Sequence, residues 1–194
     1  IYVDNGTIIG TNSVGGVLGR GYATVLDNVY AGMGGGGLAV GNGNNSTGSI
    51  YNIGGIAGSL RYYYGGLCAV LESQNYADVD SLLSGGGIGG IVGQLGSDKS
   101  GNGPIVIAYC NNYGDITIKD SSHSSPRVCD RVAGGIGGQM QGTTDNVIAY
   151  CENHGNITAE VTNPAGALAG IANYYNGLIY QCANFGDISG NTYY

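Results

Sequence analysis

Positive charge is scarce in this sequence. Only 6 of the 194 residues are Lys or Arg, against 13 Asp or Glu, and the formal net charge is −7. A protein that binds nucleic acid needs a basic surface to neutralise phosphates, and the same argument applies to an anionic membrane surface. We therefore expect neither a nucleic-acid partner nor binding to an anionic membrane.

Long apolar runs are also missing, and proline and tryptophan are rare or absent. No run approaches the roughly 18–20 apolar residues that span a bilayer, so we expect no membrane insertion by this segment. The chain contains 3 prolines and no tryptophan, begins with Ile1 and shows no signal peptide. We interpret it as a mature or excised piece of a longer protein, or as a subunit that stacks.

The cysteines do not indicate a disulfide scaffold. Because their number is odd, they cannot all pair within the chain, and at least one thiol stays free. Cys110, Cys151 and Cys182 belong to a repeat described below. Cys68 and Cys129 stand outside it, and they could form a disulfide or remain free thiols, because pairing depends on geometry.

Glycine is the most abundant feature of the composition. There are 40 glycines, but charged residues make up only 10% of the chain and hydrophobic residues 42%. Disordered glycine-rich segments usually carry more charge and fewer large apolar groups. The composition therefore predicts a packed structure in which the glycines have structural roles.

Two signatures alternate along the chain. The first reads Gly-Gly-apolar-x-Gly and begins near residues 15, 54, 89, 134 and 166, where the last copy, Gly166–Gly170, is degenerate. The second reads apolar-x-x-Cys-x-Asn-x-Gly-x-Ile. Its copies are Ile107–Ile116, Ile148–Ile157 and Ile179–Ile188, with a weaker one at Val70–Val79, a degraded one from Val25 to Gly32 and a possible tail at Asn5–Ile8.

These repeats predict stacked coils of short β-strands. The apolar runs are short, β-branched and interrupted by glycine, which favours strands over helices. One unit cannot bury its apolar face alone, whereas coils stacked about 4.8 Å apart would place equivalent residues in columns. The predicted columns are an inward aliphatic ladder (Val79, Ile116, Ile157, Ile188), an asparagine ladder (Asn75, Asn112, Asn153, Asn184), corner glycines with positive φ (Gly114, Gly155, Gly186) and small buried thiols (Cys110, Cys151, Cys182).

The two alternating signatures resemble the GLUG-type repeats of bacterial surface proteins. The resemblance extends from Asn5 to Gly190, although this chain has longer loops between signatures and more tyrosine. It implies a location outside the cell, at the bacterial surface, and carries no catalytic residues. Together with the right-handed bias of parallel crossovers, it implies one all-β domain over residues 1–194: a right-handed parallel β-solenoid (β-helix) of about five coils with variable loops.

Tyrosines are the main candidates for ligand binding. Tyr62, Tyr63 and Tyr64 form one group and Tyr174 and Tyr175 another, each in a loop that follows a Gly-Gly-type signature. Successive tyrosines point to both faces of a strand, so at least one of each group is expected to be exposed. Exposed rings suit a surface glycan or a protein ligand. The alternative is that they cover the flank of the solenoid.

Asp78, Asp115 and Asp187 share a predicted column that Asn156 interrupts. Stacked carboxylates repel unless water or a cation separates them, and calcium accepts such oxygen ligands. A calcium site is one interpretation of this column, and exposed turn residues are the other. No other cofactor is expected.

The remaining polar residues form no catalytic set. His154 takes the column of Tyr76, Tyr113 and Phe185, as one ring in place of another, and His123 has no spaced partner for a zinc site. No acidic cluster departs from the repeat, as an active site should. We therefore expect a non-catalytic structural or adhesive segment of an extracellular bacterial surface protein or filament, with end-to-end self-association. The alternatives are a carbohydrate-binding module and a polysaccharide-active β-helix enzyme.

Overall fold

The computed structural model describes the solenoid coils and most of their connections. The described residues are 1–10, 12–34, 37–42, 52–62, 66–81, 86–96, 103–119, 131–141, 145–160, 167–173 and 176–190. Within these ranges the chain forms 27 β-strands and no helix, so none of them contains a helix that could cross a membrane.

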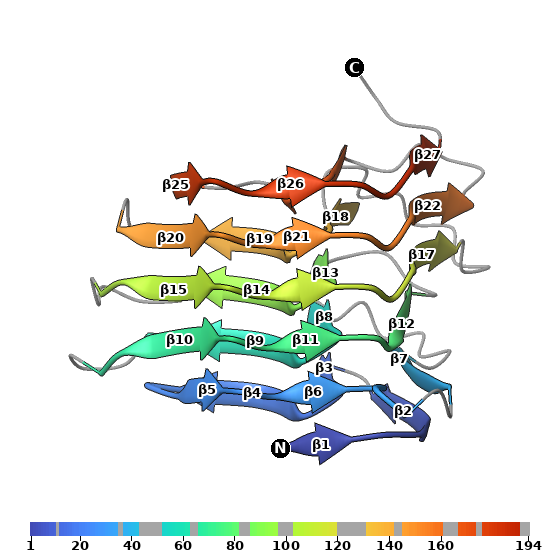
Figure 1. Cartoon of the computed structure of the whole chain (residues 1–194), viewed down its shortest axis with the longest axis horizontal. Coiled ribbons are helices and arrows are strands. Elements are labelled where there is room, and N and C mark those ends of the chain that lie inside the picture. The colour runs from blue at the N-terminus through green and yellow to red at the C-terminus, as the bar shows by residue number, and fades with distance from the viewer. Residues whose placement is uncertain are drawn as a thin grey trace.

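The strands form five parallel sheets, which the chain visits in a fixed order. We name these sheets A to E in the order in which the first coil meets them. Strands β1–β5 make the first coil, four further coils follow, and β26 and β27 begin a sixth, so the coils stack like rungs from the N-terminus upward (Figure 1). The predicted all-β parallel β-solenoid is confirmed.

Sheets A and B each contain six strands, and sheets C, D and E each contain five. Sheet A is β1 (Tyr2–Val3), β6 (Tyr30–Ala31), β11 (Gln74–Asn75), β16 (Asn111–Asn112), β21 (Glu152–Asn153) and β26 (Ala183–Asn184). Sheet B is β2 (Gly6–Gly10), β7 (Leu38–Asn42), β12 (Asp78–Ser81), β17 (Ile116–Lys119), β22 (Ile157–Glu160) and β27 (Ile188–Gly190).

The other three sheets complete each coil. Sheet C is β3 (Ser13–Gly15), β8 (Asn52–Gly54), β13 (Gly86–Gly89), β18 (Arg131–Gly134) and β23 (Ala167–Ala169). Sheet D is β4 (Leu18–Tyr22), β9 (Ala57–Arg61), β14 (Val92–Gly96), β19 (Gly137–Gln141) and β24 (Ala172–Asn173). Sheet E is β5 (Val25–Asp27), β10 (Cys68–Leu71), β15 (Ile105–Ala108), β20 (Asn146–Ala149) and β25 (Gly177–Tyr180).

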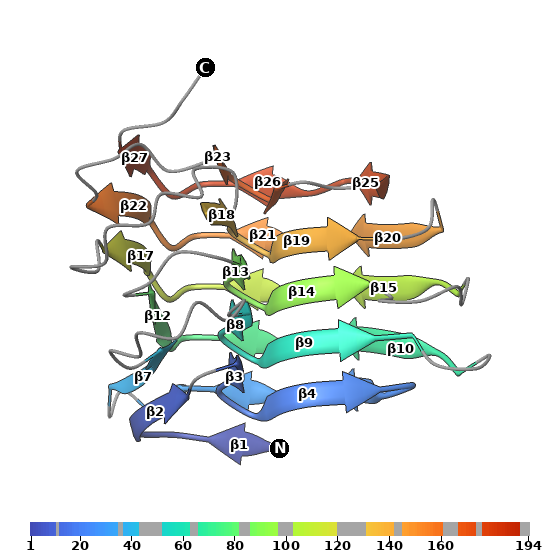
Figure 2. The same ribbon diagram turned by 180° about the vertical axis from the view of Figure 1, so that it is seen from behind.

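The solenoid is right-handed. In Figure 1 the near strands of sheets E and A run from left to right as the chain climbs toward the C-terminus. In Figure 2, seen from behind, the strands of sheet D are near and also run from left to right. A chain that advances in this sense on both sides while it rises describes a right-handed coil.

The core consists of columns of aliphatic side chains. Val79, Ile116 and Ile157 pair in register and are completely buried, which confirms the inward aliphatic ladder. Ile188 continues this column in the sixth coil but is 45% exposed, because no described coil covers it. Sheet E contributes a second column. Its buried members are Leu26, Val70, Ile107 and Ile148.

The first signature forms the turn between sheets C and D, where its second glycine lies against the asparagine ladder. A Cβ added to Gly90 would lie 2.2 Å from the carbonyl oxygen of Gly135 and 2.3 Å from Cγ of Asn112. Any side chain at this position would therefore collide with both the next coil and the ladder. Gly55, Gly135 and Gly170 lie in the same way against Asn75, Asn153 and Asn184.

The last copy of the first signature lies three residues later than predicted. The register pairs Gly134 with Ala169, and a Cβ on Gly135 would meet the carbonyl oxygen of Gly170. The structural equivalent of Gly134 is therefore Ala169, not Gly166, which lies outside the described residues. Gly166 and Gly170 have the spacing of the first and last glycines of the signature, which is why the copy was placed there. In the structure Ala169 and Gly170 fill the two leading glycine positions instead.

The prediction of positive φ at the corner glycines is wrong. Gly114, Gly155 and Gly186 do not adopt it, and the left-handed residue in these coils instead precedes the cysteine column, at Tyr109 (φ 57°) and Tyr150 (φ 54°). Glycine is needed at the corner because the coils approach closely there. A Cβ on Gly155 would lie 1.9 Å from the carbonyl oxygen of Gly114.

Candidate functional site

The asparagine ladder is the most regular polar feature of the interior. The Nδ2 of each asparagine donates to the Oδ1 of the next, at 2.7 Å for Asn75 to Asn112, for Asn112 to Asn153 and for Asn153 to Asn184. Each Nδ2 also donates to the carbonyl oxygen two residues ahead in its own coil. The predicted ladder is confirmed, and its amides hold neighbouring coils together.

The cysteine column is buried and chemically quiet. Cys110 and Cys151 are completely buried and Cys182 partly so, and each thiol donates to a backbone carbonyl oxygen within its own coil. The hydrogen bond with the Cys110 thiol, followed by burial, raises the pKa of Cys151 far above its ordinary value. Burial is also the main reason that the pKa of Cys182 is raised. A raised pKa keeps the thiols of Cys151 and Cys182 protonated near neutral pH, which makes them poor nucleophiles and poor metal ligands.

The thiol of Cys151 makes stability depend on alkaline pH. The folded protein keeps this proton, whereas the unfolded chain releases it above pH about 9, so the stability that the folded state has below this pH is lost as pH rises. We expect Cys151 to account for a fall of about 1.4 kcal/mol in the free energy of unfolding one pH unit above that value.

Urea denaturation at pH 8 and pH 10 measures this fall. The control is Cys151→Ser, because Ser73 occupies the equivalent position in an earlier coil and donates to the Leu71 carbonyl oxygen in the same way. The variant should lose less stability on the shift to pH 10 than the unmodified protein. An equal loss in both proteins would contradict the assignment.

Cys68 lies in the structure as a free, buried thiol that donates to the carbonyl oxygen of Arg61 at 3.1 Å. Cys129 and His123 lie outside the described residues. Of the two arrangements left open for Cys68, the structure therefore shows the free thiol.

The aspartate column links neighbouring coils. Oδ1 of Asp78 accepts the N–H of Asp115 at 3.0 Å, and Oδ1 of Asp115 accepts the N–H of Asn156 at 2.8 Å. Oδ1 of Asn156 in turn accepts the N–H of Asp187 at 3.0 Å. A carboxylate oxygen and an amide oxygen accept the same backbone hydrogen bond here, which explains how asparagine fits the column.

These contacts give the aspartates a structural role without a cation. Among the described residues, no group of three or more His, Cys, Asp or Glu side chains is placed to hold a metal ion. A calcium site at Asp78, Asp115 and Asp187 stays a prediction. It would use the second carboxylate oxygen of Asp78 and of Asp115 and the carboxylate of Asp187.

The predicted tyrosine loops follow sheet D. Tyr62 begins the connection between β9 and β10 and is half-buried, with its ring against Gly103 in the next coil, where an added Cβ would lie 1.6 Å from the ring. This position fits the covering role better than the binding role. Tyr63, Tyr64, Tyr174 and Tyr175 lie outside the described residues, so their binding role stays a prediction.

A ladder of stacked rings runs along the outer side of sheet A. We call it the outer aromatic ladder: Tyr76, Tyr113, His154 and Phe185. Ring centroids lie 4.7 Å apart for the first pair and 4.8 Å for the other two, with interplanar angles of 12°, 11° and 16°. The prediction that His154 replaces a ring in this column is confirmed.

Each ring of the ladder is matched to the side chain two residues before it. The hydroxyl of Tyr76 donates to Oε1 of Gln74 at 2.7 Å, and Nδ2 of Asn111 donates to the hydroxyl of Tyr113 at 3.4 Å. Burial, followed by the neighbouring Tyr113 and Tyr30, raises the pKa of Tyr76, so its hydroxyl keeps its proton.

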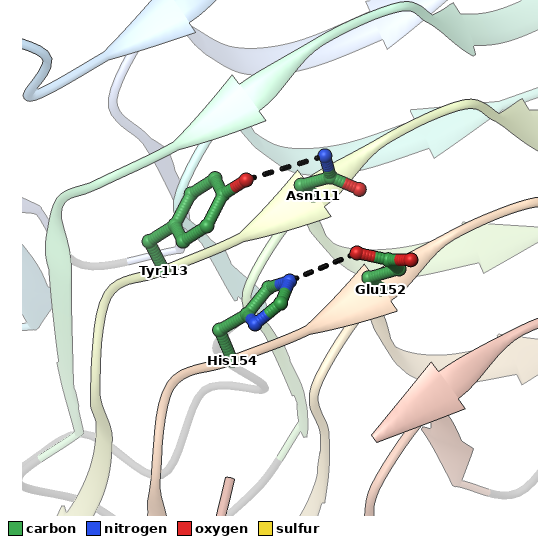
Figure 3. Close-up of polar contacts among 4 residues, drawn as sticks. All are labelled: Asn111, Tyr113, Glu152 and His154. Carbon is green, nitrogen blue, oxygen red and sulfur yellow. Dashed lines mark hydrogen bonds and ion pairs between the residues drawn. The ribbon is translucent and has the colours of Figure 1, made fainter. Parts of the chain in front are cut away.

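The next coil repeats this pairing with different chemistry. Nε2 of His154 lies 3.0 Å from Oε2 of Glu152, and Figure 3 shows this pair directly beside the Asn111–Tyr113 pair. Phe185, which has no polar atom on its ring, follows Ala183 in the same arrangement. The outer side of sheet A therefore presents a repeated pair, made of a ring and a side chain suited to it.

A second group of rings flanks the same strands at the corner between sheets E and A. We call it the tyrosine cluster: Tyr109, Tyr150 and Tyr180. The rings of Tyr109 and Tyr150 stack at 4.8 Å with an interplanar angle of 1°, and Tyr180 meets Tyr150 edge to face at 5.5 Å. Sequence reasoning missed this cluster. The available signal was the tyrosine that precedes the cysteine in both Ile-Ala-Tyr-Cys segments.

The two ring groups and the polar column between them make one surface, which we call the aromatic face. Its polar column is Gln74, Asn111 and Glu152. Sheets E and A lie side by side toward the viewer in Figure 1, so the aromatic face is the one seen there. No family model, no curated protein and no solved structure matches this chain. The function is therefore proposed from the structure itself, that is, from the ladders inside the solenoid and the face outside it.

Proposed function

We propose that this chain is a non-catalytic structural and adhesive segment of an extracellular bacterial surface protein. The observation that carries the proposal is the use made of the polar side chains. The asparagine ladder and the aspartate column repeat from coil to coil, and their polar atoms bond the next coil. Side chains used in this way hold a stack of coils together, and the outer faces of the stack are left to make contacts.

The sequence also supports the proposed role as a surface segment. The alternating signatures resemble GLUG-type repeats, which occur in arrays in large bacterial adhesins. A repeat protein of this kind gains its stability from contacts between neighbouring coils, so it can be long without a single central core. This property suits a spacer that carries a binding surface away from the cell.

The surface location can be tested on intact cells that produce the protein. Antibodies against the purified chain should label unpermeabilised cells, and brief protease treatment of the cells should remove the label. Labelling that appears only after permeabilisation would overturn the proposed location. The control is an antibody against a cytoplasmic protein, which should label permeabilised cells alone.

The non-catalytic part of the proposal has its own measurement. The purified chain, incubated with plant, fungal and bacterial polysaccharides, should release no new reducing ends and no unsaturated products. Release of either would favour the alternative of a polysaccharide-active β-helix enzyme. End-to-end self-association of copies stays a prediction, and light scattering of the purified chain measures it.

A further inference from the structure

The aromatic face offers parts of ring surfaces as well as ring edges. Stacked rings with centroids 4.7–4.8 Å apart and nearly parallel planes must be offset sideways, because rings in contact are separated by only about 3.5 Å. Each ring therefore covers only part of the face of the neighbouring ring, and a strip of that face stays in solvent. Exposure agrees with this: Tyr113, which is stacked on both sides, is still 39% exposed, and Tyr150 is 42% exposed.

Hydrogen-bonding groups lie within reach of these strips. The polar column of Gln74, Asn111 and Glu152 runs between the outer aromatic ladder and the tyrosine cluster. Within one coil the three groups follow one another at every second residue, as Tyr109, Asn111 and Tyr113 do. The column continues toward the N-terminus as Tyr30 and Tyr2, whose rings stack at 5.0 Å. Ring faces beside amide and carboxylate groups suit a ligand that has both apolar C–H faces and hydroxyls, as sugars do.

The charge of the face selects against anionic ligands. None of the 6 Lys and Arg residues belongs to a described strand of sheet E or sheet A. Asp27, Glu72 and Glu152 lie on these strands or at the corner between them. A sulfated or uronic-acid polymer, a nucleic acid or an anionic membrane would be repelled by these three carboxylates.

The repeat of the face favours a linear polymer. Equivalent groups recur at each coil, at the strand spacing of about 4.8 Å, which is close to the length of one sugar unit in an extended chain. A polysaccharide lying along the solenoid axis would therefore present one sugar to each coil, whereas an extended peptide advances only about 3.3 Å per residue and would fall out of step.

We propose that the aromatic face binds an unbranched, uncharged polysaccharide that lies along the solenoid axis. This inference rests on the proposed adhesive role and names its ligand class and its site. The tyrosine cluster and the outer aromatic ladder stack on the sugar rings from either side of the polar column, and Gln74, Asn111 and Glu152 bond the hydroxyls. Weak contacts repeated over several coils add up along one polymer chain.

The test uses a double variant that keeps the backbone unchanged. Tyr109 and Tyr150 are non-glycine residues in the left-handed region, which asparagine tolerates better than tyrosine. Asn28 already occupies the equivalent position in an earlier coil, with φ of 55°. The variant Y109N/Y150N should therefore fold normally, which circular dichroism and the urea midpoint check, while it removes two rings from the face.

Binding is measured by sedimentation with insoluble cellulose and chitin and by retardation in gels that contain soluble β-glucan. The unmodified protein should bind at least one of these, and Y109N/Y150N should bind about tenfold more weakly, since each ring contact contributes enough for a severalfold change. A second variant, Phe185→Ser, removes an exposed ring of the outer aromatic ladder and should weaken binding as well. Heparin and polygalacturonate, both anionic, should not bind.

The loop tyrosines provide the matched comparison. The double variant Y63S/Y174S removes two of the loop tyrosines that the sequence predicts to bind, and assignment of binding to the aromatic face predicts that it binds normally. Loss of binding in this variant with full binding by Y109N/Y150N would overturn the assignment to the face, as would preference for the anionic polymers. Failure to bind any uncharged polysaccharide would overturn the inference as a whole. The proposed surface location would be unaffected, because antibody labelling tests it separately.

Discussion

Replacing Asn112 with leucine is expected to lower the free energy of unfolding by about 3–5 kcal/mol. Asn112 lies in the middle of the asparagine ladder and is completely buried. Its loss removes a hydrogen bond at Oδ1 of Asn153, one at the carbonyl oxygen of Gly114 and one from Nδ2 of Asn75. Each buried group left without a partner costs about 1–3 kcal/mol.

The shape of the substitute adds to this cost. Leucine is similar in volume, but its Cγ is tetrahedral where that of asparagine is planar, and Cγ of Asn112 lies so close to Gly90 that an added Cβ there would be 2.3 Å from it. Urea denaturation followed by circular dichroism measures the change through the shift in midpoint. A midpoint close to that of the unmodified protein would show that the ladder is not a source of stability.

Asn184→Leu is the matched control for this variant. Asn184 ends the ladder in the sixth coil, is exposed, and has one ladder bond, from Asn153, in place of two. Water can replace the lost partner there, so the same substitution should cost about 1 kcal/mol. The difference between the two variants isolates the effect of burial from the effect of the side chain.

Replacing Gly155 with alanine is expected to destabilise the protein by more than about 4 kcal/mol, or to prevent folding. The added Cβ would lie 1.9 Å from the carbonyl oxygen of Gly114 and 2.6 Å from its carbonyl carbon. These are backbone atoms of a neighbouring coil, so no rotamer change relieves the collision. The coils must separate at this corner, and values of this size are otherwise rare for a single methyl group.

Two further substitutions show whether the stacking is the cause. Gly186→Ala creates a similar collision, 2.0 Å from the carbonyl oxygen of Gly155, but in the sixth coil, which can move away with the loss of fewer contacts. It should therefore cost less than Gly155→Ala. Ala77→Gly, at the same corner of an earlier coil, should cost about 1 kcal/mol or less, since it removes only a methyl group. Equal losses for all three variants would contradict the explanation.

Much of this fold could be predicted from the sequence because stacking repeats the same constraint in every coil. The column of Asn75, Asn112, Asn153 and Asn184 was visible as a fixed position in the second signature, and the hydrogen bonds of the ladder follow from the strand spacing. The aliphatic ladder and the substitution of His154 for another ring were visible for the same reason. Periodicity identifies residues that share a column.

Periodicity does not show which columns touch one another within a coil. The contact between Gly90 and Asn112 joins the two signatures across the interior, but the connections between them differ in length from coil to coil, so their relative register was hidden. The shift of the last Gly-Gly-type copy from Gly166 to Ala169 has the same origin. The mistaken φ of Gly155 has a different cause, because glycine serves close approach as well as left-handed backbone, and composition does not separate the two.

The tyrosine cluster was missed because two of its residues have a backbone conformation that is unusual for tyrosine. Tyrosine rarely adopts φ near +55°, so a sequence gives no reason to place Tyr109 or Tyr150 at a left-handed corner. Strained positions of this kind persist where the surrounding structure fixes them, and they cluster at functional sites. The same corner is held by Asn28 in an earlier coil without a ring, so the tyrosines are not required for the turn itself.

The asparagine ladder also makes the solenoid electrically directional. Every ladder bond runs from Nδ2 of one coil to Oδ1 of the coil above it, from Asn75 through to Asn184. The amide dipoles therefore point the same way and polarise one another, as peptide dipoles do along a helix. The N-terminal end of the column carries partial negative charge and the C-terminal end partial positive charge. The two ends of this solenoid are thus chemically unlike, and an acceptor group that docks on the amide of Asn184 would find no equivalent site at Asn75.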